Sequence, residues 1–173
     1  MKPRDLPIAL AVCVIAGAAG FLSFRLLHPA RPATTELRPD LEFRDLNGQP
    51  HRLSEWNGKL VLLNFWATWC GPCLHEMPML VEAQAQNGAR GLQVVGVALD
   101  EREPVAQMSA RLQLNYPVMA GGAEIGMAMD QLGDELGALP FSVLIAADGR
   151  ILGRRSGALS AEELKDWLAN LPP

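Results

Sequence analysis

Two cysteines separated by two residues are the part of the sequence best suited to chemistry. They lie in the segment Trp69-Cys70-Gly71-Pro72-Cys73, where a short apolar run gives way to a helical pattern. A cysteine at a helix N-terminus faces unpaired backbone N–H groups and the positive end of the helix dipole, and both favour the thiolate. We therefore predict that Cys70 attacks a substrate disulfide, and that Cys73, one turn further along, displaces the mixed disulfide that results.

Other uses of this cysteine pair are weaker. Zinc requires four ligands, and the only other cysteine, Cys13, lies in the apolar N-terminal segment. Covalent c-type haem requires a histidine directly after the second cysteine, where this chain has Leu74 and places His75 one position later. A permanent structural disulfide and peroxidase chemistry on Cys70 alone stay open, although a bridge between such near neighbours closes too small a loop to stabilise much. No metal and no cofactor is expected.

The residues around the cysteines predict alternating strands and helices. Asn47-Gly48 and Asp148-Gly149 are turn signals between strands, Ser54 to Gly58 is typical of one helical turn, and Ser160 to Glu163 is typical of a capping box. Strands are predicted over 41–46, 51–53, 60–66, 92–99, 116–119, 142–145 and 151–153, and helices over 72–86, 103–112, 125–136 and 160–168. This order predicts an α/β three-layer sandwich, in which a central mixed sheet has helices on both faces and an N-terminal β-hairpin extends it.

The N-terminal segment predicts export from the cytoplasm. Residues 1–5 carry two basic groups, and residues 6–24 contain no charge. As a helix this uncharged run reaches about 30 Å, which is roughly one hydrocarbon thickness. We predict a cytoplasmic flank over 1–5, a transmembrane anchor over 6–27, a Pro-rich spacer over 28–39 and the folded domain over 40–173. A cleavable signal peptide is the alternative, and it also exports the domain.

The composition excludes several classes of protein. The chain has 173 residues, of which 49% are hydrophobic and 20% charged, and this is typical of a globular domain with a short appendage. Its net charge is −4, and without residues 1–37 it is −6. An acidic body without a cluster of Lys and Arg is a poor phosphate binder, so nucleic acid is not an expected partner.

The segment Val61 to Cys73, VLLNFWATWCGPC, resembles the active-site strand and motif of the thioredoxin superfamily. The wider chain resembles its membrane-anchored, extracytoplasmic TlpA/ResA branch, from about Leu37 to the C-terminus. The residues that carry this likeness are Gly58-Lys59, Glu76, Pro78, Val95-Gly96-Val97 with Asp100, Leu139-Pro140-Phe141 and Asp148-Gly149. The resemblance implies a thioredoxin-like fold and thiol–disulfide exchange.

The resemblance also implies a second part of the site. Pro140 is expected to be cis and to face the cysteines, and it would turn the backbone of Leu139 outward to pair with an extended substrate segment. An ordinary trans proline that opens a strand is the alternative. Pro78 is expected inside the active-site helix. With Leu139, the residues Trp69, Gly71 and Pro72 form the expected substrate-binding surface, where Trp69 offers an apolar contact.

One departure from cytoplasmic thioredoxin concerns proton transfer. Thioredoxin carries a buried aspartate six residues before its first cysteine, and this chain has Asn64 there, which cannot titrate. Glu76 lies three residues after Cys73 and therefore on the same helical face. We predict that Glu76 is partly buried, has a raised pKa and exchanges a proton with Cys73. A solvated first-turn glutamate is the alternative.

The sequence thus predicts a thiol–disulfide oxidoreductase on the periplasmic side of a bacterial inner membrane. The Gly71-Pro72 dipeptide and the resemblance imply a reductase, recharged by a membrane carrier of the thiol–disulfide type. Its implied substrates are apocytochrome c or copper-site assembly proteins. A disulfide-donating oxidase and a non-catalytic copper chaperone that binds through Cys70 and Cys73 stay open as alternatives.

Overall fold

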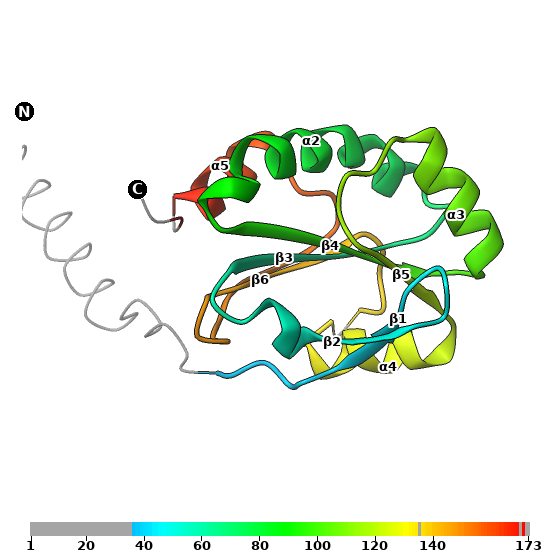
Figure 1. Ribbon diagram of the computed structural model, residues 1–173, viewed down its shortest axis with the longest axis horizontal. Helices are drawn as coiled ribbons and strands as arrows, with labels where there is room; N and C mark the ends of the chain where they lie inside the picture. Colours follow the sequence, from blue (N-terminus) through cyan, green and yellow to red (C-terminus); the bar gives the residue numbers. More distant parts are fainter. Residues whose placement is uncertain (1–35, 135, 170, 172–173) are drawn as a thin grey trace, which may run out of the picture. The chain divides into compact units, whose positions relative to one another are not determined.

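The centre of the fold is strand β3 (Leu60–Trp66), in which all seven residues are buried. The computed structural model describes residues 36–134, 136–169 and 171, and within them β3 pairs with a parallel neighbour, β4 (Leu92–Leu99), and an antiparallel one, β6 (Phe141–Ile145). Outer strands β5 (Val118–Gly121) and β7 (Ile151–Ser156) complete a mixed sheet in the order β5-β4-β3-β6-β7 (Figure 1). Because β3 is covered on both faces, its sequence is apolar almost throughout.

Helices cover both faces of this sheet. Helices α2 (Gly71–Asn87), α3 (Arg102–Arg111) and α5 (Ala161–Leu168) lie on one face, and α4 (Ala123–Gln131) lies on the other (Figure 1). The face with α4 also carries a hairpin of β1 (Glu42–Arg44) and β2 (Pro50–Arg52). Short 3-10 turns follow β2 and α2, as η1 (Leu53–Trp56) and η2 (Gly88–Arg90). The predicted three-layer thioredoxin-like sandwich is confirmed.

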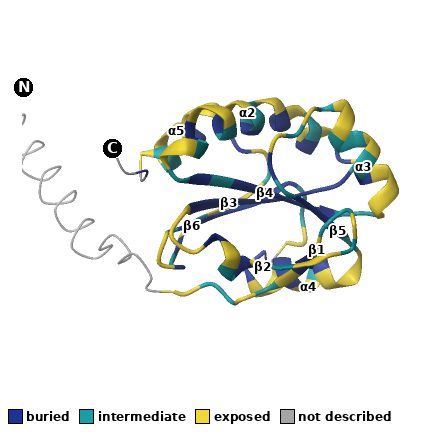
Figure 2. Cartoon of the chain, viewed as in Figure 1, coloured by how far each residue is buried: buried dark blue, intermediate teal, exposed yellow. Residues whose placement is uncertain are grey.

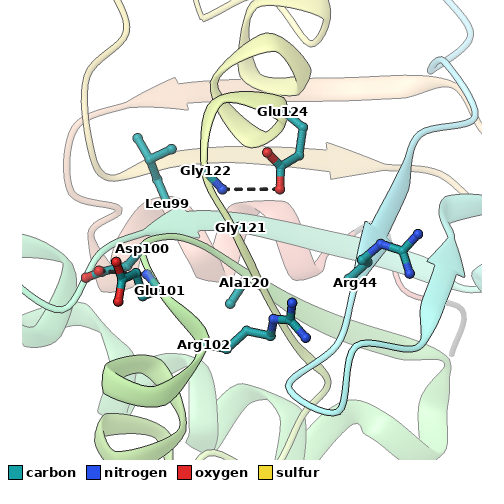
Figure 3. Close-up of a pocket in the computed structure, with 9 residues that line it drawn as sticks. All are labelled: Arg44, Leu99, Asp100, Glu101, Arg102, Ala120, Gly121, Gly122 and Glu124. Atoms are coloured by element: carbon teal, nitrogen blue, oxygen red, sulfur yellow. Dashed lines mark hydrogen bonds between the residues drawn. The ribbon is translucent and has the colours of Figure 1, made fainter.

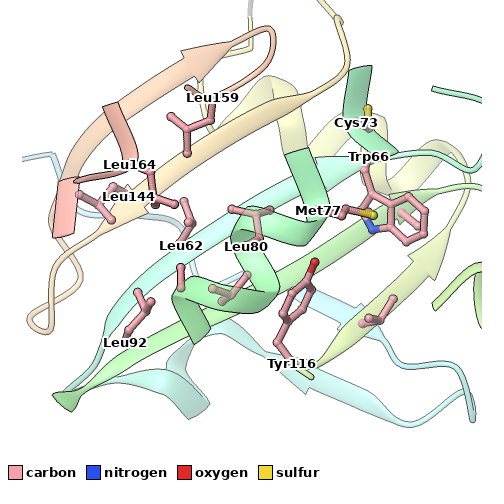
Figure 4. Close-up of a cluster of buried hydrophobic side chains, with 14 of the residues drawn as sticks. Leu62, Trp66, Cys73, Met77, Leu80, Leu92, Tyr116, Leu144, Leu159 and Leu164 are labelled. Atoms are coloured by element: carbon pink, nitrogen blue, oxygen red, sulfur yellow. The ribbon is translucent and has the colours of Figure 1, made fainter. Parts of the chain in front are cut away.

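The two faces of the sheet bury separate hydrophobic clusters. The central strands are largely buried, whereas the helices expose their outer sides (Figure 2). Alternate residues of β3 explain the separation, since Leu62 and Trp66 point toward α2 while Leu63 and Phe65 point toward α4. In the α2 cluster, Cys73 and Met77 of α2 lie close to Trp66 (Figure 4). The second cysteine is therefore part of the hydrophobic core.

Several element boundaries differ from the prediction. The predicted turn at Asn47-Gly48 is a three-residue loop closed by the Asp45 and Gln49 pair, with Gly48 in the left-handed region at φ 81°. Helix α4 ends at Gln131 rather than 136, because Gly133 adopts a positive φ of 90° and turns the chain. Strand β5 begins at Val118, and β7 extends three residues further than predicted.

Three predicted segments lie outside the described residues: the N-terminal flank, the membrane segment and most of the spacer. The described residues belong to a unit spanning Thr35–Pro173. Within that described part, no helix is both long and apolar enough to cross a membrane. Backbone hydrogen bonds join Glu36 O to Ile151 N and Arg38 N to Gly149 O, each across 2.9 Å. The first contacts with the sheet thus begin a few residues before the predicted domain boundary at residue 40.

Candidate active site

Cys70 lies at a helix N-terminus, as the sequence predicts, and is the N-cap residue of α2. It forms a disulfide with Cys73, and the backbone N–H of Cys73 donates a hydrogen bond to Cys70 Sγ across 3.3 Å. Cys70 is 6% exposed and Cys73 is fully buried. In the reduced chain the same N–H and the helix dipole would favour a Cys70 thiolate. A substrate can therefore reach only Cys70, and the sulfur of Cys73 lies beneath it.

The loop that leads from β3 to Cys70 is fastened to the end of β4. The backbone N–H of Thr68 donates to Asp100 Oδ2 across 3.2 Å, and the Thr68 hydroxyl donates to the same oxygen. Although partial burial works in the opposite direction, hydrogen bonds from Thr68 and Glu101 hold the pKa of Asp100 below its usual range. An ionised Asp100 thus fixes the loop two residues before the attacking sulfur.

Pro140 lies at the same end of the sheet as the cysteine loop. The Leu139–Pro140 peptide bond is cis, as the resemblance implies. In the antiparallel register Phe141 pairs with Phe65, so Pro140 comes level with Trp66, the last residue of β3. Gly157 N donates to Pro140 O across 2.8 Å. Within the described chain, the backbone of Leu139 makes no hydrogen bond.

Glu76 is buried beneath the cysteines at 4% exposure, one turn of α2 after Cys73. Its two carboxylate oxygens have separate donors. Asn64 Nδ2 donates to Oε1 across 2.7 Å, and the backbone N–H of Leu159 donates to Oε2 across 2.7 Å. Asn64 Nδ2 also lies 3.0 Å from Ser142 Oγ, which accepts from it. The expected solvated first-turn alternative for Glu76 is therefore wrong.

Burial raises the pKa of the Glu76 carboxyl above its ordinary value, against the hydrogen bonds from Leu159 and Asn64, which lower it. Burial, and to a lesser degree the nearby Glu76 charge, also raise the pKa of the Tyr116 hydroxyl. This hydroxyl is buried without a hydrogen-bond partner in the described chain, and it points toward α2 (Figure 4). The carboxyl thus has the burial and the raised pKa that the sequence predicts, and its proton exchange with Cys73 stays a prediction.

The other predicted site residues have clear positions. Trp69 is 69% exposed, and Gly71 and Pro72 are exposed in the first turn of α2. His75 is exposed on α2, and Pro78 lies inside the helix, which continues past it to Asn87. Trp69, Gly71 and Pro72 flank Cys70 in the sequence. Because they are exposed, they form the surface that a partner meets first.

A further hollow of the described chain lies away from the cysteines. About 540 Å³ in volume, it is formed at the carboxyl ends of β4 and β5 and at the start of α3 and α4 (Figure 3). Arg44 and Arg102 enter it together with the carboxylates of Asp100, Glu101 and Glu124. No cysteine, serine, threonine or lysine lines it. Among residues 36–134, 136–169 and 171, no group of three or more His, Cys, Asp or Glu side chains is arranged to hold a metal ion.

This geometry agrees with what known proteins show. A family model described as Redoxin matches residues 32–170. The chain belongs to the Redoxin family. It is 32% identical over 178 residues to the thiol-disulfide oxidoreductase ResA of Geobacillus kaustophilus, with 99% of each chain covered. It is also 32% identical over 136 residues to ResA of Geobacillus thermodenitrificans, which covers 78% of this chain and 76% of that one.

A solved structure of a similar protein has the same fold. A thiol:disulfide interchange protein of the thioredoxin family from Chlorobium tepidum superposes with a TM-score of 0.71 at 28% identity, over 80% of this chain and 97% of that one. Together with the relatives, this structure identifies the chain as a TlpA/ResA-like member of the thioredoxin superfamily and a protein thiol–disulfide oxidoreductase.

Sequence reasoning missed four groups that contact the site. They are Thr68 and Asp100, which fix the loop, and the Leu159 N–H and Ser142 hydroxyl, which complete the Glu76 network. Asp100 carries a usable signal, because an acidic residue directly after a buried strand lies at the same edge of the sheet as the cysteine loop. Leu159 and Ser142 carry none, since their roles depend on where distant segments pack.

Proposed function

We propose that this oxidoreductase works as a reductase of protein disulfides outside the cytoplasm, with the Cys70/Cys73 dithiol as its electron donor. In this proposal residues 6–27 anchor the chain in the inner membrane, and a membrane carrier of the thiol–disulfide type restores the dithiol after each turnover. Apocytochrome c-like chains and copper-site assembly proteins are the proposed substrates. The names of the ResA relatives agree with thiol–disulfide exchange and specify neither substrate nor direction.

The observation that carries the reducing direction is the buried Glu76 carboxyl one turn below Cys73. A dithiol–disulfide pair is a strong oxidant when its reduced, ionised form is stabilised, as in strongly oxidising members of this superfamily. Here the buried ionisable group one turn of α2 after Cys73 is an acid, and α2 contains no Lys or Arg. A negative charge at Glu76 opposes a thiolate at Cys73, and so it lowers the reduction potential of the pair.

The surface around Cys70 supports a protein substrate. The exposed Trp69 offers an apolar contact, and the unpaired backbone of Leu139 offers hydrogen bonds to an extended segment. A nearly covered sulfur requires close approach of the partner chain, which a flexible segment around a disulfide can make.

The test is to equilibrate the full chain with glutathione buffers and to measure the fraction reduced. We expect a reduction potential at or below about −220 mV, in the range of reducing thioredoxins and glutaredoxins. A potential above about −180 mV would identify a disulfide donor instead. An insulin-reduction assay separates catalysis from copper binding alone, because the chain should accelerate reduction and its Cys70→Ser variant should not.

The substrates can be identified by covalent trapping. A Cys73→Ser variant lacks the resolving sulfur, so each substrate attacked by Cys70 stays attached as a mixed disulfide. Expressed in the native host, this variant should retain exported proteins with cysteine pairs. Retention of cytoplasmic proteins only would contradict the proposed location.

A further inference from the structure

One face of α3 and the active-site loop line a surface groove next to Cys70. The groove has a volume of about 410 Å³, and we call it the α3 groove. Thr68 and Trp69 line it from the loop, and α3 contributes Pro104, Gln107, Met108 and Arg111. These four helical positions have the spacing i, i+3, i+4, i+7, so they form one continuous stripe along the helix.

The lining of the α3 groove combines apolar side chains with a single positively charged one. Trp69, Pro104 and Met108 supply the apolar surface, and Trp69 is the most exposed of the chain's described tryptophans. Arg111 is exposed at the last turn of α3. In the described part of the chain no carboxylate forms an ion pair with it. An apolar contact next to a positive charge that forms no ion pair is complementary to an acidic, partly apolar segment.

The occupant follows from the position of the groove. Cys70 is 6% exposed, so a substrate sulfur that reaches it presses the residues on either side of that sulfur against the neighbouring surface. Trp69, the residue before Cys70, is part of the groove. From Pro104 to Arg111 the helix advances about 10 Å at 1.5 Å per residue. About three residues of extended chain cover this length at about 3.3 Å each.

We propose that the α3 groove binds the substrate segment next to the reacting cysteine, and that Arg111 selects substrates with an acidic side chain there. This inference rests on the proposed function and adds a substrate class to it. Thr68 and Trp69 join the groove to the catalytic loop, so the segment bound by α3 is continuous with the sulfur under attack.

The preference for an acidic side chain can be measured in a reaction in which each reduced chain reduces one peptide disulfide. The Cys70 thiolate attacks the peptide sulfur of a disulfide between a peptide cysteine and 2-thiopyridine, and the thiopyridine leaves with the electron pair of the broken bond. The Cys73 thiol, after loss of its proton, then displaces the peptide thiolate, which takes up a proton. The chain becomes a disulfide, and its two electrons reduce one peptide disulfide to two thiols.

The experiment uses the full chain, reduced with dithiothreitol and freed from it, and two peptides activated in this way. In each peptide leucine flanks the cysteine on both sides, and the next residue on each side is aspartate in one peptide and lysine in the other. The unaltered chain should react about three- to tenfold faster with the aspartate peptide, as one exposed ion pair and its like-charge counterpart allow. Arg111→Gln should remove this preference, and Arg111→Glu should reverse it. Higher salt should reduce it.

Arg102→Gln is the matched control, because Arg102 is an exposed arginine on the same helix that does not line the α3 groove. It should keep the preference. The rate of each variant with the neutral 2-hydroxyethyl disulfide gives its basal reactivity, and the two peptide rates are compared after division by it. Equal rates for both peptides, or an unchanged preference in Arg111→Glu, would overturn the inference while the reductase activity stands. Failure of the unaltered chain to reduce any of the three disulfides would overturn the proposed function and this inference with it.

Discussion

Asn64 Nδ2 donates a hydrogen bond to Glu76 Oε1 across 2.7 Å in a region where the two residues are 1% and 4% exposed. The amide of β3 thus holds a buried acid on α2, one turn after the resolving cysteine. A buried carboxyl requires donors for both oxygens, and Leu159 supplies the second. The arrangement keeps a titratable group next to the disulfide without an ion pair from any described residue.

Glu76→Gln should lower the pKa of the Cys73 thiol in the reduced chain, because an ionised Glu76 opposes a second negative charge nearby. The same change should raise the reduction potential of the pair, by on the order of 30 mV if about 1.4 kcal/mol of repulsion is lost. Thiol titration by NMR and equilibration with glutathione measure both effects. Glu82→Gln, an exposed change on the same helix, is the control. Unchanged titration of Cys73 in Glu76→Gln would reject the proton-exchange role.

The stability of the oxidised chain should also depend on Glu76 and pH. Its folded-state pKa is raised, so its contribution to stability is fully present below the ordinary value and is lost as the pH rises through the raised one. The free energy of unfolding of the unaltered chain, relative to Glu76→Gln, should therefore fall over the pH range above the ordinary glutamate value of 4.5. Urea unfolding across this range measures the difference. Parallel curves for the two chains would show that Glu76 titrates normally.

Asp100→Asn should loosen the loop before Cys70. The change weakens two hydrogen bonds from Thr68, one of them from its backbone, and should cost about 1–2 kcal/mol at pH 7. Because the folded-state pKa of Asp100 is lowered, this loss should shrink as the pH falls below the ordinary value. Thr68→Val, which removes only the hydroxyl donor, should cost less. Equal stability of Asp100→Asn and the parent at pH 7 would exclude the fastening role.

Gly96→Ala should destabilise the chain by about 1–3 kcal/mol. Gly96 pairs with Asn64 across β3 and β4, and an added Cβ would lie 3.2 Å from a ring carbon of Tyr116 and 3.3 Å from Trp66 Nε1. Gly126→Ala on α4 is the matched control, because an added Cβ there meets nothing within 4 Å. That variant should gain about 0.5–1 kcal/mol from helix propensity. Equal unfolding midpoints for the two variants would contradict the close packing.

The sequence predicts the parts of this fold that depend on local pattern. The almost entirely apolar β3, the capping box at Ser160 and the position of Cys70 at a helix N-terminus are confirmed at or within one residue of their expected places. The length of the loop between β1 and β2 could not be predicted, because Asn47-Gly48 is compatible with two-residue and three-residue loops alike. Only the register of Asp45 with Gln49 decides between them.

In the site, too, local spacing could be predicted from the sequence, whereas contacts made by tertiary packing could not. The spacing of Glu76 from Cys73 places both on one helical face, and this indicates a shared environment from sequence alone. The donor from Leu159 lies 83 residues away, and no local pattern records which backbone N–H the tertiary packing will bring to an acid. The α3 groove is similar, since a helix was predicted over 103–112 but not the face that it turns toward Trp69.

We predict that Cys70 is the ionised, attacking sulfur and Cys73 the covered, resolving one. The most direct measurement is the rate of alkylation of each cysteine in the reduced chain as a function of pH, with the modified residue identified by mass spectrometry. Cys70 should react first, with a pKa below the value of about 8.5 for an ordinary thiol, and Cys73 should react slowly until much higher pH. Alkylation of Cys70 no faster than a free thiol near neutral pH, or faster alkylation of Cys73, would contradict the account.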